Sequence, residues 1–209
     1  MHTCSCREVH TQRRIVLTGG PGAGKTAVLE LCRQYLCQHV SILPESASLL
    51  FSGGFPRGGS VEQRAATQRA IYYVQRELER IASLDDCGLV LCDRGTVDGS
   101  AYWPGPDSLF DDVDSSLAAE LSHYDAVVHL RVPDVSAYNH VNPVRIESAL
   151  EAAAIDAQIA AAWSAHPRRF EVPSSPDFFE KAQRALALIV AEVPACCRAS
   201  LSSLPPPRA

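Results

Sequence analysis

The fold is decided by the stretch GGPGAGKT, residues Gly19–Thr26. It matches the pattern GxxxxGK followed by Ser or Thr, which is typical of loops that hold the phosphates of a nucleotide. The apolar run Ile15–Leu17 precedes it and predicts a buried strand. The segment Gly24–His39 follows it with the apolar spacing of a helix. Because the pattern lies between a strand and a helix, we expect it to bind a nucleoside triphosphate with Mg²⁺ rather than to form an ordinary glycine turn.

Each part of this phosphate loop (Gly19–Thr26) has a chemical purpose. Glycines let the backbone curl so that successive N–H groups point at phosphate oxygens, and the start of the helix adds its positive end. Lys25 is expected to reach the β- and γ-phosphates, and the Thr26 hydroxyl to ligate Mg²⁺. The predicted nucleotide-binding residues here are Gly19, Gly20, Gly22, Ala23, Gly24, Lys25, Thr26 and Ala27.

Strand-like and helix-like segments alternate along the rest of the chain. Further strands are predicted at Ser41–Leu43, Leu89–Cys92, Ala126–Leu130 and Arg169–Val172. Further helices are predicted at Val61–Ser83, Ser115–Ser122, Arg145–Ala165 and Phe178–Val193. This alternation predicts an α/β fold with a parallel sheet covered by helices on both faces. Ligands of such sheets gather beyond the carboxyl ends of the strands, where the predicted loops Phe51–Ser60 and Gly99–Asp114 also lie.

Length and charge limit the classes of protein to consider. The chain has 209 residues, a net charge of -5 and a pI near 5.8. These values indicate one domain and give no reason to expect nucleic acid as a partner. No long apolar run or signal peptide stands out, so we expect no membrane partner and a cytoplasmic location. We predict a flexible segment over 1–13, the folded domain over 14–193 and a disordered tail over 194–209.

The chain has eight cysteines. Cys32 and Cys92 fall on a predicted helix and strand, where buried thiols serve as small apolar side chains. Cys4 with Cys6, and Cys196 with Cys197, lie near the two ends of the chain. A zinc site shared by these pairs is a weak hypothesis, because neither pair has the usual two-residue gap between ligands.

Asp93 and Arg94 follow the third predicted strand. In phosphate-loop enzymes an acid at this position holds Mg²⁺, and an arginine beside it can contact a phosphoryl group. The sequence lacks the NKxD motif of GTPases and the Asp-Glu strand ending of ring-forming ATPases. The Asp-Arg pair is instead typical of small nucleoside and nucleotide kinases.

Several motifs together resemble one family. The matching residues are Leu17–Thr26, Leu43–Ala47, Asp93–Gly95, Asp98-Gly99, Ala101-Tyr102, Asn142–Glu147, Ile155-Asp156, Trp163, His166-Pro167, Phe178 and Lys181. They resemble the NadR/Ttd14-type phosphate-loop domain family (AAA_28-like), over about Ile15 to Val190. The resemblance implies a nucleoside-kinase-like sheet of five parallel strands in the order 2-3-1-4-5. One branch of the family contains a ribosylnicotinamide kinase, and another is described as binding GTP and phosphoinositides.

The resemblance to kinases also implies roles for residues beyond the phosphate loop. Glu45, after the second strand, would face the hydroxyl of a phosphoryl acceptor and can take its proton. A lid over about 131–165 would supply an arginine to the transferred phosphate, with Arg145 the first choice and Arg131 the second. Ser174 and Ser175 would contact the adenine base. Asp156, on the lid helix, would either orient the neighbours of Arg145 or be merely solvated, and the solvated interpretation is preferred.

Three functions remain open from the sequence. The first is an ATP- and Mg²⁺-dependent phosphotransferase for a small hydroxyl-bearing acceptor such as a nucleoside, with Lys25, Glu45, Asp93, Arg94 and Arg145 as its catalytic residues. The second is a regulatory or phosphoinositide-binding module that binds ATP or GTP and hydrolyses it slowly. Its only candidates for a basic patch are Arg57, Arg64, Arg69 and Arg76. The third and weaker reading is a kinase for RNA ends or nucleotide metabolites. Neither the acceptor nor the oligomeric state follows from the sequence.

Overall fold

The computed structural model describes residues 4–133 and 148–198, and its centre is a parallel sheet of five strands. The strands are β1 (Arg13–Thr18), β2 (Val40–Leu43), β3 (Leu89–Asp93), β4 (Ala126–Leu130) and β5 (Arg169–Val172). Their order is β2-β3-β1-β4-β5, so the predicted fold class and strand order are confirmed. The central strands β3, β1 and β4 carry buried apolar runs because both faces of the sheet are covered, whereas the edge strand β5 includes the exposed Glu171.

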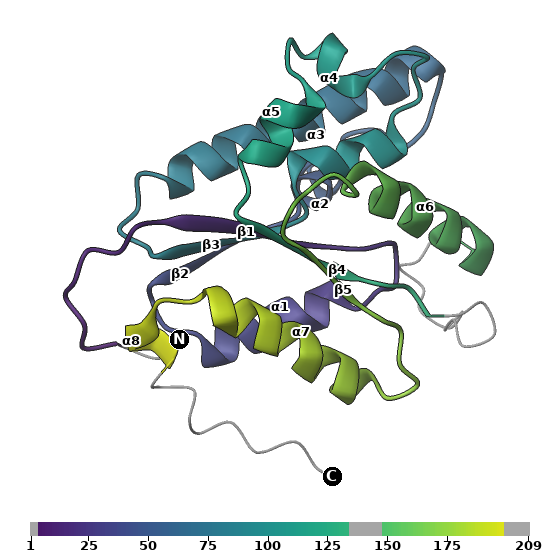
Figure 1. The fold of residues 1–209 in the computed structure, drawn as a ribbon. Helices are drawn as coiled ribbons and strands as arrows, with labels where there is room; N and C mark the ends of the chain where they lie inside the picture. Colours follow the sequence, from purple (N-terminus) through teal and green to yellow (C-terminus); the bar gives the residue numbers. More distant parts are fainter. Residues whose placement is uncertain (1–3, 134–147, 199–209) are drawn as a thin grey trace.

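Helices lie on both sides of the sheet (Figure 1). One face carries α1 (Lys25–Tyr35) and α7 (Phe178–Glu192), and the other carries α3 (Val61–Ala82), α5 (Leu117–Ser122) and α6 (Ala149–Ala162). The short elements are α2 (Ser46–Ser52), the 3₁₀ helix η1 (Thr96–Tyr102), α4 (Leu109–Asp112) and α8 (Ala195–Arg198). No helix in the described parts of the chain is both long and apolar enough to span a bilayer.

Alternate residues of the central strands feed two separate cores. In β1, Ile15 and Leu17 belong to the core formed with α1 and α7. Val16 belongs to the second core, which is formed with α3, η1 and α6. All three side chains are fully buried. Successive strand side chains point to opposite faces, so one strand anchors both helical layers. Burial of each such side chain contributes about 1.5–3 kcal/mol to stability. The sheet thus fixes the loops at its carboxyl edge.

Two segments predicted as loops contain helices. Part of α2 overlaps the predicted loop Phe51–Ser60, and both η1 and α4 overlap the predicted loop Gly99–Asp114. The glycines and prolines in these segments predicted irregular structure, but packing against the rest of the protein stabilises short helices there. In α4, Ser108 caps the first turn while Leu109 and Phe110 are buried in the core. The first helix is also shorter than predicted, because its chain becomes extended at Leu36.

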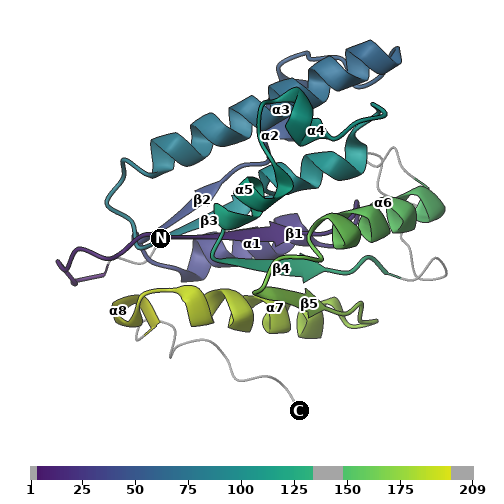
Figure 2. The same cartoon turned by 45° about the horizontal axis from the view of Figure 1, so that its top comes forward.

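The predicted disordered tail is wrong at its beginning. Residues Ala195–Arg198 form α8, Cys197 is buried, and Arg198 donates to the carbonyl oxygens of Val193 and Ala191. Residues 199–209 lie outside the described part of the chain. The N-terminal segment runs beside α8 in both ribbon views (Figures 1 and 2), and the Cys4 thiol lies 3.8 Å from the carbonyl oxygen of Cys196. Cys4 and Cys196 also pack against the same core, so the N-terminal segment and α8 lie together.

Candidate active site

The phosphate loop leaves the carboxyl end of β1 and leads into α1. Its backbone requires glycine at two positions, where φ is +139° at Gly19 and +95° at Gly24. A Cβ atom on Gly19 would lie 2.1 Å from the carbonyl oxygen of Leu130, and one on Gly24 would lie 2.4 Å from the ring of Phe178. Side chains rarely adopt such φ values, and neither position has room for one. The loop is therefore held tightly between β4 and α7.

Lys25 is buried beneath this loop. Its Nζ donates to the carbonyl oxygens of Gly19 at 2.8 Å and Gly20 at 3.2 Å. Burial lowers the pKa of Lys25 to about 8, and the nearby Arg94 adds to this shift, while Asp93 and Glu45 oppose it. A buried ammonium beside a guanidinium favours an anionic ligand, because added negative charge offsets their repulsion.

Asp93 and Thr26 carry oxygen atoms of the kind that bind a metal ion. Burial raises the pKa of Asp93 to about 6, against the opposing effect of the Lys25 ammonium. Its Oδ1 atom is buried and has no hydrogen-bond partner among the described residues. Thr26 and Asp93 both line one pocket at the carboxyl edge of the sheet. An unpaired carboxylate oxygen and a hydroxyl in one pocket fit the oxygen ligands that Mg²⁺ prefers.

Arg94 adopts an unusual backbone conformation and forms two ion pairs. Its φ is +70°, in the left-handed region that most residues avoid. The Nε atom donates to Glu45 at 2.6 Å and one terminal nitrogen donates to Asp98 at 3.1 Å. Burial alone would raise the pKa of Glu45, but Arg94 and the Ser48 hydroxyl lower it below its ordinary value. Glu45 is therefore ionised at neutral pH and available as a hydrogen-bond acceptor.

Asp98 is the centre of a buried network that sequence reasoning left without a role. Its carboxylate accepts hydrogen bonds from the Gly95 amide at 3.1 Å, the Trp163 indole at 3.0 Å and the Thr18 hydroxyl. These partners come from β1, the start of η1 and the end of α6. Asp98 therefore sets the position of Arg94 relative to the phosphate loop. The sequence signal that could have identified Asp98 is its presence in the Asp98-Gly99 motif shared with the family.

A pocket of about 480 Å³ joins these residues. It extends from the phosphate loop across the carboxyl end of β3 to α2, α3 and η1. The predicted site residues that line it are Lys25, Thr26, Glu45, Asp93 and Arg94. The segments expected to shape an acceptor site contribute Phe51, Arg57, Gly99 and Tyr102. Residues distant in the sequence thus share one concave site at the predicted edge of the sheet.

The interpretation of Asp156 as solvated is wrong. Its side chain is fully buried and accepts hydrogen bonds from the Gly20 amide at 2.9 Å and from His129 at 2.8 Å, and its other oxygen pairs with Arg131 at 3.0 Å. Burial alone would raise the pKa of Asp156, but its bonds with His129 and Gly20 lower it below the ordinary value. Asp156 is thus a support for the phosphate loop.

Lys181 supports the loop from the opposite face. Its Nζ donates to the carbonyl oxygen of Ala23 at 2.8 Å and to that of Arg131. Burial lowers its pKa to about 8, against the opposing effect of Asp156. The sequence did not predict this role, because the spacing of residues along a helix does not distinguish a buried lysine from an exposed one.

Some of the described residues that were predicted to bind ligands do not line the pocket, and these include the loop residues Gly19, Gly20, Gly22, Ala23, Gly24 and Ala27. Ser174 and Ser175 lie between β5 and α7, outside its lining, and the Ser175 hydroxyl bonds to Glu180. Arg131 pairs with Asp156 and also lies outside the lining. Arg145 falls outside the described residues, as does much of the predicted lid, and α6 covers its later part.

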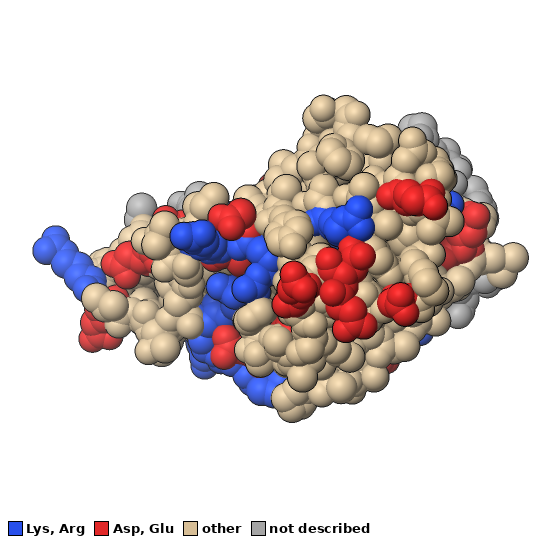
Figure 3. Space-filling model, turned by 90° about the horizontal axis from the view of Figure 1, so that it is seen from above, with Lys and Arg blue, Asp and Glu red and all other residues tan. Residues whose placement is uncertain are grey.

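Basic and acidic side chains mix on the face formed by α3, α4 and α5 (Figure 3). Two of the four candidate arginines pair with acids there: Arg69 with Asp112 at 2.8 Å and Arg76 with Glu120 at 3.9 Å. The other two, Arg57 and Arg64, line the pocket. These four arginines therefore do not form one basic patch.

Comparisons with known proteins agree with this fold. A crystal structure of thymidylate kinase from Ehrlichia chaffeensis has a similar fold, with a TM-score of 0.57 and 16% sequence identity. The match covers 87% of this chain and 98% of that one. No curated protein matched this sequence. The family model AAA_28, described as an AAA domain, matches residues 14–181. The chain therefore belongs to the AAA_28 family of phosphate-loop domains.

Proposed function

We propose that this protein is an ATP- and Mg²⁺-dependent phosphotransferase that acts on a hydroxyl group of a small acceptor, such as a nucleoside or a related metabolite. One observation carries the proposal: Glu45, Asp93 and Arg94 open onto the same 480 Å³ pocket as the phosphate loop. That volume falls in the range of small-molecule sites, and it extends past the loop toward α3. A protein that only binds or hydrolyses a nucleotide has no need of this additional space.

In this proposal the nucleotide phosphates bind along the Gly19–Thr26 backbone. Lys25 leaves its carbonyl partners and contacts the phosphate oxygens. Thr26 and Asp93 would hold Mg²⁺, which shields the charge of the triphosphate when it is bound. Phosphoryl transfer depends mainly on position and charge stabilisation, and these residues supply both.

The acceptor would lie between α2, α3 and η1. Its hydroxyl donates a hydrogen bond to the ionised Glu45, which orients it toward the terminal phosphate and can take its proton. Arg94 holds Glu45 in place and lies near the transferred group. Arg145 remains the proposed lid arginine, and Ser174 with Ser175 the proposed contact for the base.

A second candidate has one observation in its favour. Arg57 and Arg64 line the acceptor end of the pocket, and arginine is well suited to bind phosphate. An acceptor that already carries a phosphate, as in a nucleotide-metabolite kinase, would use them. The regulatory phosphoinositide-binding alternative has less support, because Arg69 and Arg76 are paired with acids.

The test is a thermal-shift panel followed by turnover. ATP·Mg²⁺ and GTP·Mg²⁺ are each combined with nucleosides, nucleoside monophosphates, sugars and vitamin alcohols. A nucleotide at 100 times its Kd adds about 2.7 kcal/mol of stability, which raises Tm by roughly 5–10 °C for a chain of this size. We expect ATP·Mg²⁺ to give this shift and one acceptor to increase it. Lys25→Ala should lose the nucleotide shift.

Glu45→Gln is the variant that separates transfer from binding. It should keep the nucleotide shift and lose roughly 10²-fold or more in turnover of the acceptor. A shift by GTP alone, with no acceptor adding to it, would instead support the regulatory module. Equal turnover in Glu45→Gln and the wild type would refute the role given to Glu45.

A further inference from the structure

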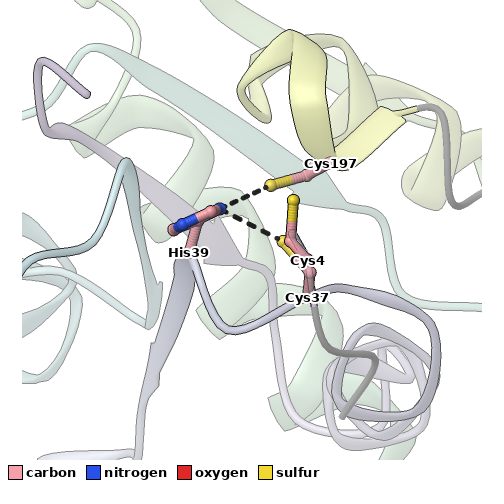
Figure 4. Close-up of side chains that lie close together, drawn as sticks. All are labelled: Cys4, Cys37, His39 and Cys197. Atoms are coloured by element: carbon pink, nitrogen blue, oxygen red, sulfur yellow. Dashed lines mark hydrogen bonds between the residues drawn. The ribbon is translucent and has the colours of Figure 1, made fainter. Parts of the chain in front are cut away.

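A group of four potential metal ligands lies at the amino end of the sheet, opposite the phosphate loop. Cys4 comes from the N-terminal segment, Cys37 and His39 from the turn between α1 and β2, and Cys197 from α8. Their sulfur and nitrogen atoms all lie within 4.8 Å of one another. The four side chains point toward a common centre (Figure 4). We call this group the thiol–imidazole cluster.

The distances fit tetrahedral coordination of zinc. Zinc binds thiolate sulfur at about 2.3 Å and imidazole nitrogen at about 2.0 Å, so neighbouring ligand atoms lie roughly 3.5–3.8 Å apart. The Nδ1 atom of His39 lies 3.7 Å from the Cys37 sulfur and 3.3 Å from the Cys197 sulfur. The set therefore requires only small movements to enclose an ion.

The surroundings of the cluster are those of a closed site. Cys37, His39 and Cys197 are buried, and Cys4 is partly buried. The His10 ring packs edge-on against His39, with ring centroids 4.9 Å apart. The backbone carbonyl of His39 accepts hydrogen bonds from the amides of Gly88 and Leu89, which fixes that residue at the start of β2. Four protein ligands without an open position are typical of structural rather than catalytic zinc.

We propose that Cys4, Cys37, His39 and Cys197 bind one Zn²⁺ ion that ties the segment before β1 and the helix α8 to the sheet. Three thiolates and one imidazole form a ligand set common in structural zinc sites. The segment before β1 has no helix or strand of its own in the described residues, and α8 is only four residues long. Neither end therefore has much local stability, and coordination supplies a tertiary link between them.

Three more side chains that can bind metal lie beside the cluster: His10, Cys6 and Cys196. The Cys196 sulfur lies 3.1 Å from His10 Nε2, 3.6 Å from the Cys197 sulfur and 3.8 Å from His39 Nδ1. Cys6 lies 3.8 Å from His10. Cys196 is thus the thiol that competes with Cys197 for the fourth position. Cys197 is preferred because its sulfur is closer to His39 and because it is buried.

The first experiment uses the full chain, expressed without a histidine tag and purified under reducing conditions. Elemental analysis should find one zinc ion per chain. After chelation, titration with Co²⁺ should give the visible bands of a tetrahedral site and a thiolate-to-cobalt charge-transfer band that saturates at one ion per chain. Chelation should also lower Tm, because metal binding stabilises the folded state.

Variants show which residues bind the ion. Cys37→Ser and Cys197→Ser should each weaken zinc binding roughly a hundredfold or more, since even the partners of zinc ligands matter by 10–100-fold. Cys196→Ser should keep the ion. Cys87→Ser is the matched control, because Cys87 is a buried thiol bonded to Gln12 and lies outside the cluster. Far-UV circular dichroism shows whether each variant is folded.

Three results would overturn the proposal. One is reduced wild-type protein that contains no metal and gives no thiolate-to-cobalt band. Another is a disulfide found by mass spectrometry between cysteines of the cluster in protein purified without reductant, with zinc unable to bind after reduction. The third is a Cys196→Ser variant that loses zinc while Cys197→Ser keeps it. If Cys37→Ser does not fold, the wild-type cobalt spectrum still decides the question.

Discussion

At the scale of single residues, the candidate active site contains features that destabilise the folded state. Asp93 has an unpaired, buried carboxylate oxygen, and Arg94 has a left-handed backbone conformation. Such features persist where surrounding structure imposes them, and they are common at functional sites. In this protein the strands β1 and β3 and the Asp98 network impose them.

The pKa of Asp93 leads to a prediction about pH. Burial raises the pKa of this carboxyl to about 6, above its ordinary value near 4. The folded state therefore holds the proton more tightly, so this group's contribution to stability is present below about pH 4 and is lost as pH rises through about 6. Asp93→Asn cannot ionise. We expect it to match the wild type in stability near pH 4 and to exceed it by up to about 2.7 kcal/mol at pH 8.

The measurement is Tm against pH for both proteins without nucleotide. Asp86→Asn, at an exposed position, is the control and should show no such trend. The same Asp93→Asn variant should lose Mg²⁺-dependent turnover. A difference in Tm that stays constant from pH 4 to pH 8 would contradict the argument.

At the scale of elements, two helices from the second half of the chain hold the phosphate loop in place. Asp156 of α6 accepts a hydrogen bond from the Gly20 amide, and Lys181 of α7 donates to the carbonyl oxygen of Ala23. The ring of Phe178, at the start of α7, lies against Gly24. Gly20 and Ala23 are only three positions apart, yet they are held by helices that lie on opposite faces of the sheet. The conformation of the loop depends on the packing of α6 and α7.

Removal of the Lys181 ammonium tests this support. Lys181→Met leaves the carbonyl oxygens of Ala23 and Arg131 without their donor in a buried place, which should cost about 1–3 kcal/mol. We also expect nucleotide affinity to fall, because the loop loses one of its supports. Chemical denaturation and nucleotide titration measure the two effects.

Arg184→Met is the matched control on the same helix. Arg184 is half-exposed and pairs with Glu180 one turn away. Exposed pairs contribute about 0–1 kcal/mol, so both stability and affinity should change little. Similar results for the two variants would show that Lys181 has no special role.

At the scale of the whole molecule, the sheet separates two sites. The pocket of about 480 Å³ lies at the carboxyl ends of the strands, and the thiol–imidazole cluster lies at the amino end of β2. The ribbon views show the N-terminal segment near α8, on the side of the sheet away from the start of α1 (Figures 1 and 2). Binding of substrates and binding of zinc should therefore act on different parts of the molecule.

Hydrogen exchange can test this separation. ATP·Mg²⁺ should slow amide exchange in Gly19–Thr26 and the start of α1, and an acceptor should add protection in α2, the first half of α3 and η1. Neither should change exchange in Cys4–Gln12 or α8. Mass spectrometry of peptic fragments supplies the measurement. Protection of α8 by nucleotide to the same degree as the phosphate loop would show that the two sites are coupled.

The sequence alone was enough to predict the fold and to bring several proposed site residues to one edge of the sheet. The glycine pattern of the phosphate loop and the apolar strands are local signals, because they arise from backbone geometry and from burial on both faces. They placed Lys25, Thr26, Asp93 and Arg94 at one edge of the sheet, where the structure has them. The helices η1 and α4 were not predicted, because the glycines and prolines of these segments indicated a loop. The tertiary packing that stabilises the two helices cannot be read from a local sequence pattern.

The remaining features depended on contacts between distant residues. Asp156 looked solvated because its own helix shows little amphipathic pattern, yet β4 and the phosphate loop surround it. The cysteine spacing argued against zinc, because coordination was sought within each pair. Only the tertiary structure brings Cys4 and Cys197 together with the turn before β2. Local sequence therefore determined the elements and the phosphate chemistry. Packing across the sheet decided which buried charges support the loop and which thiols meet, because those neighbours are set by the fold and not by spacing along the chain.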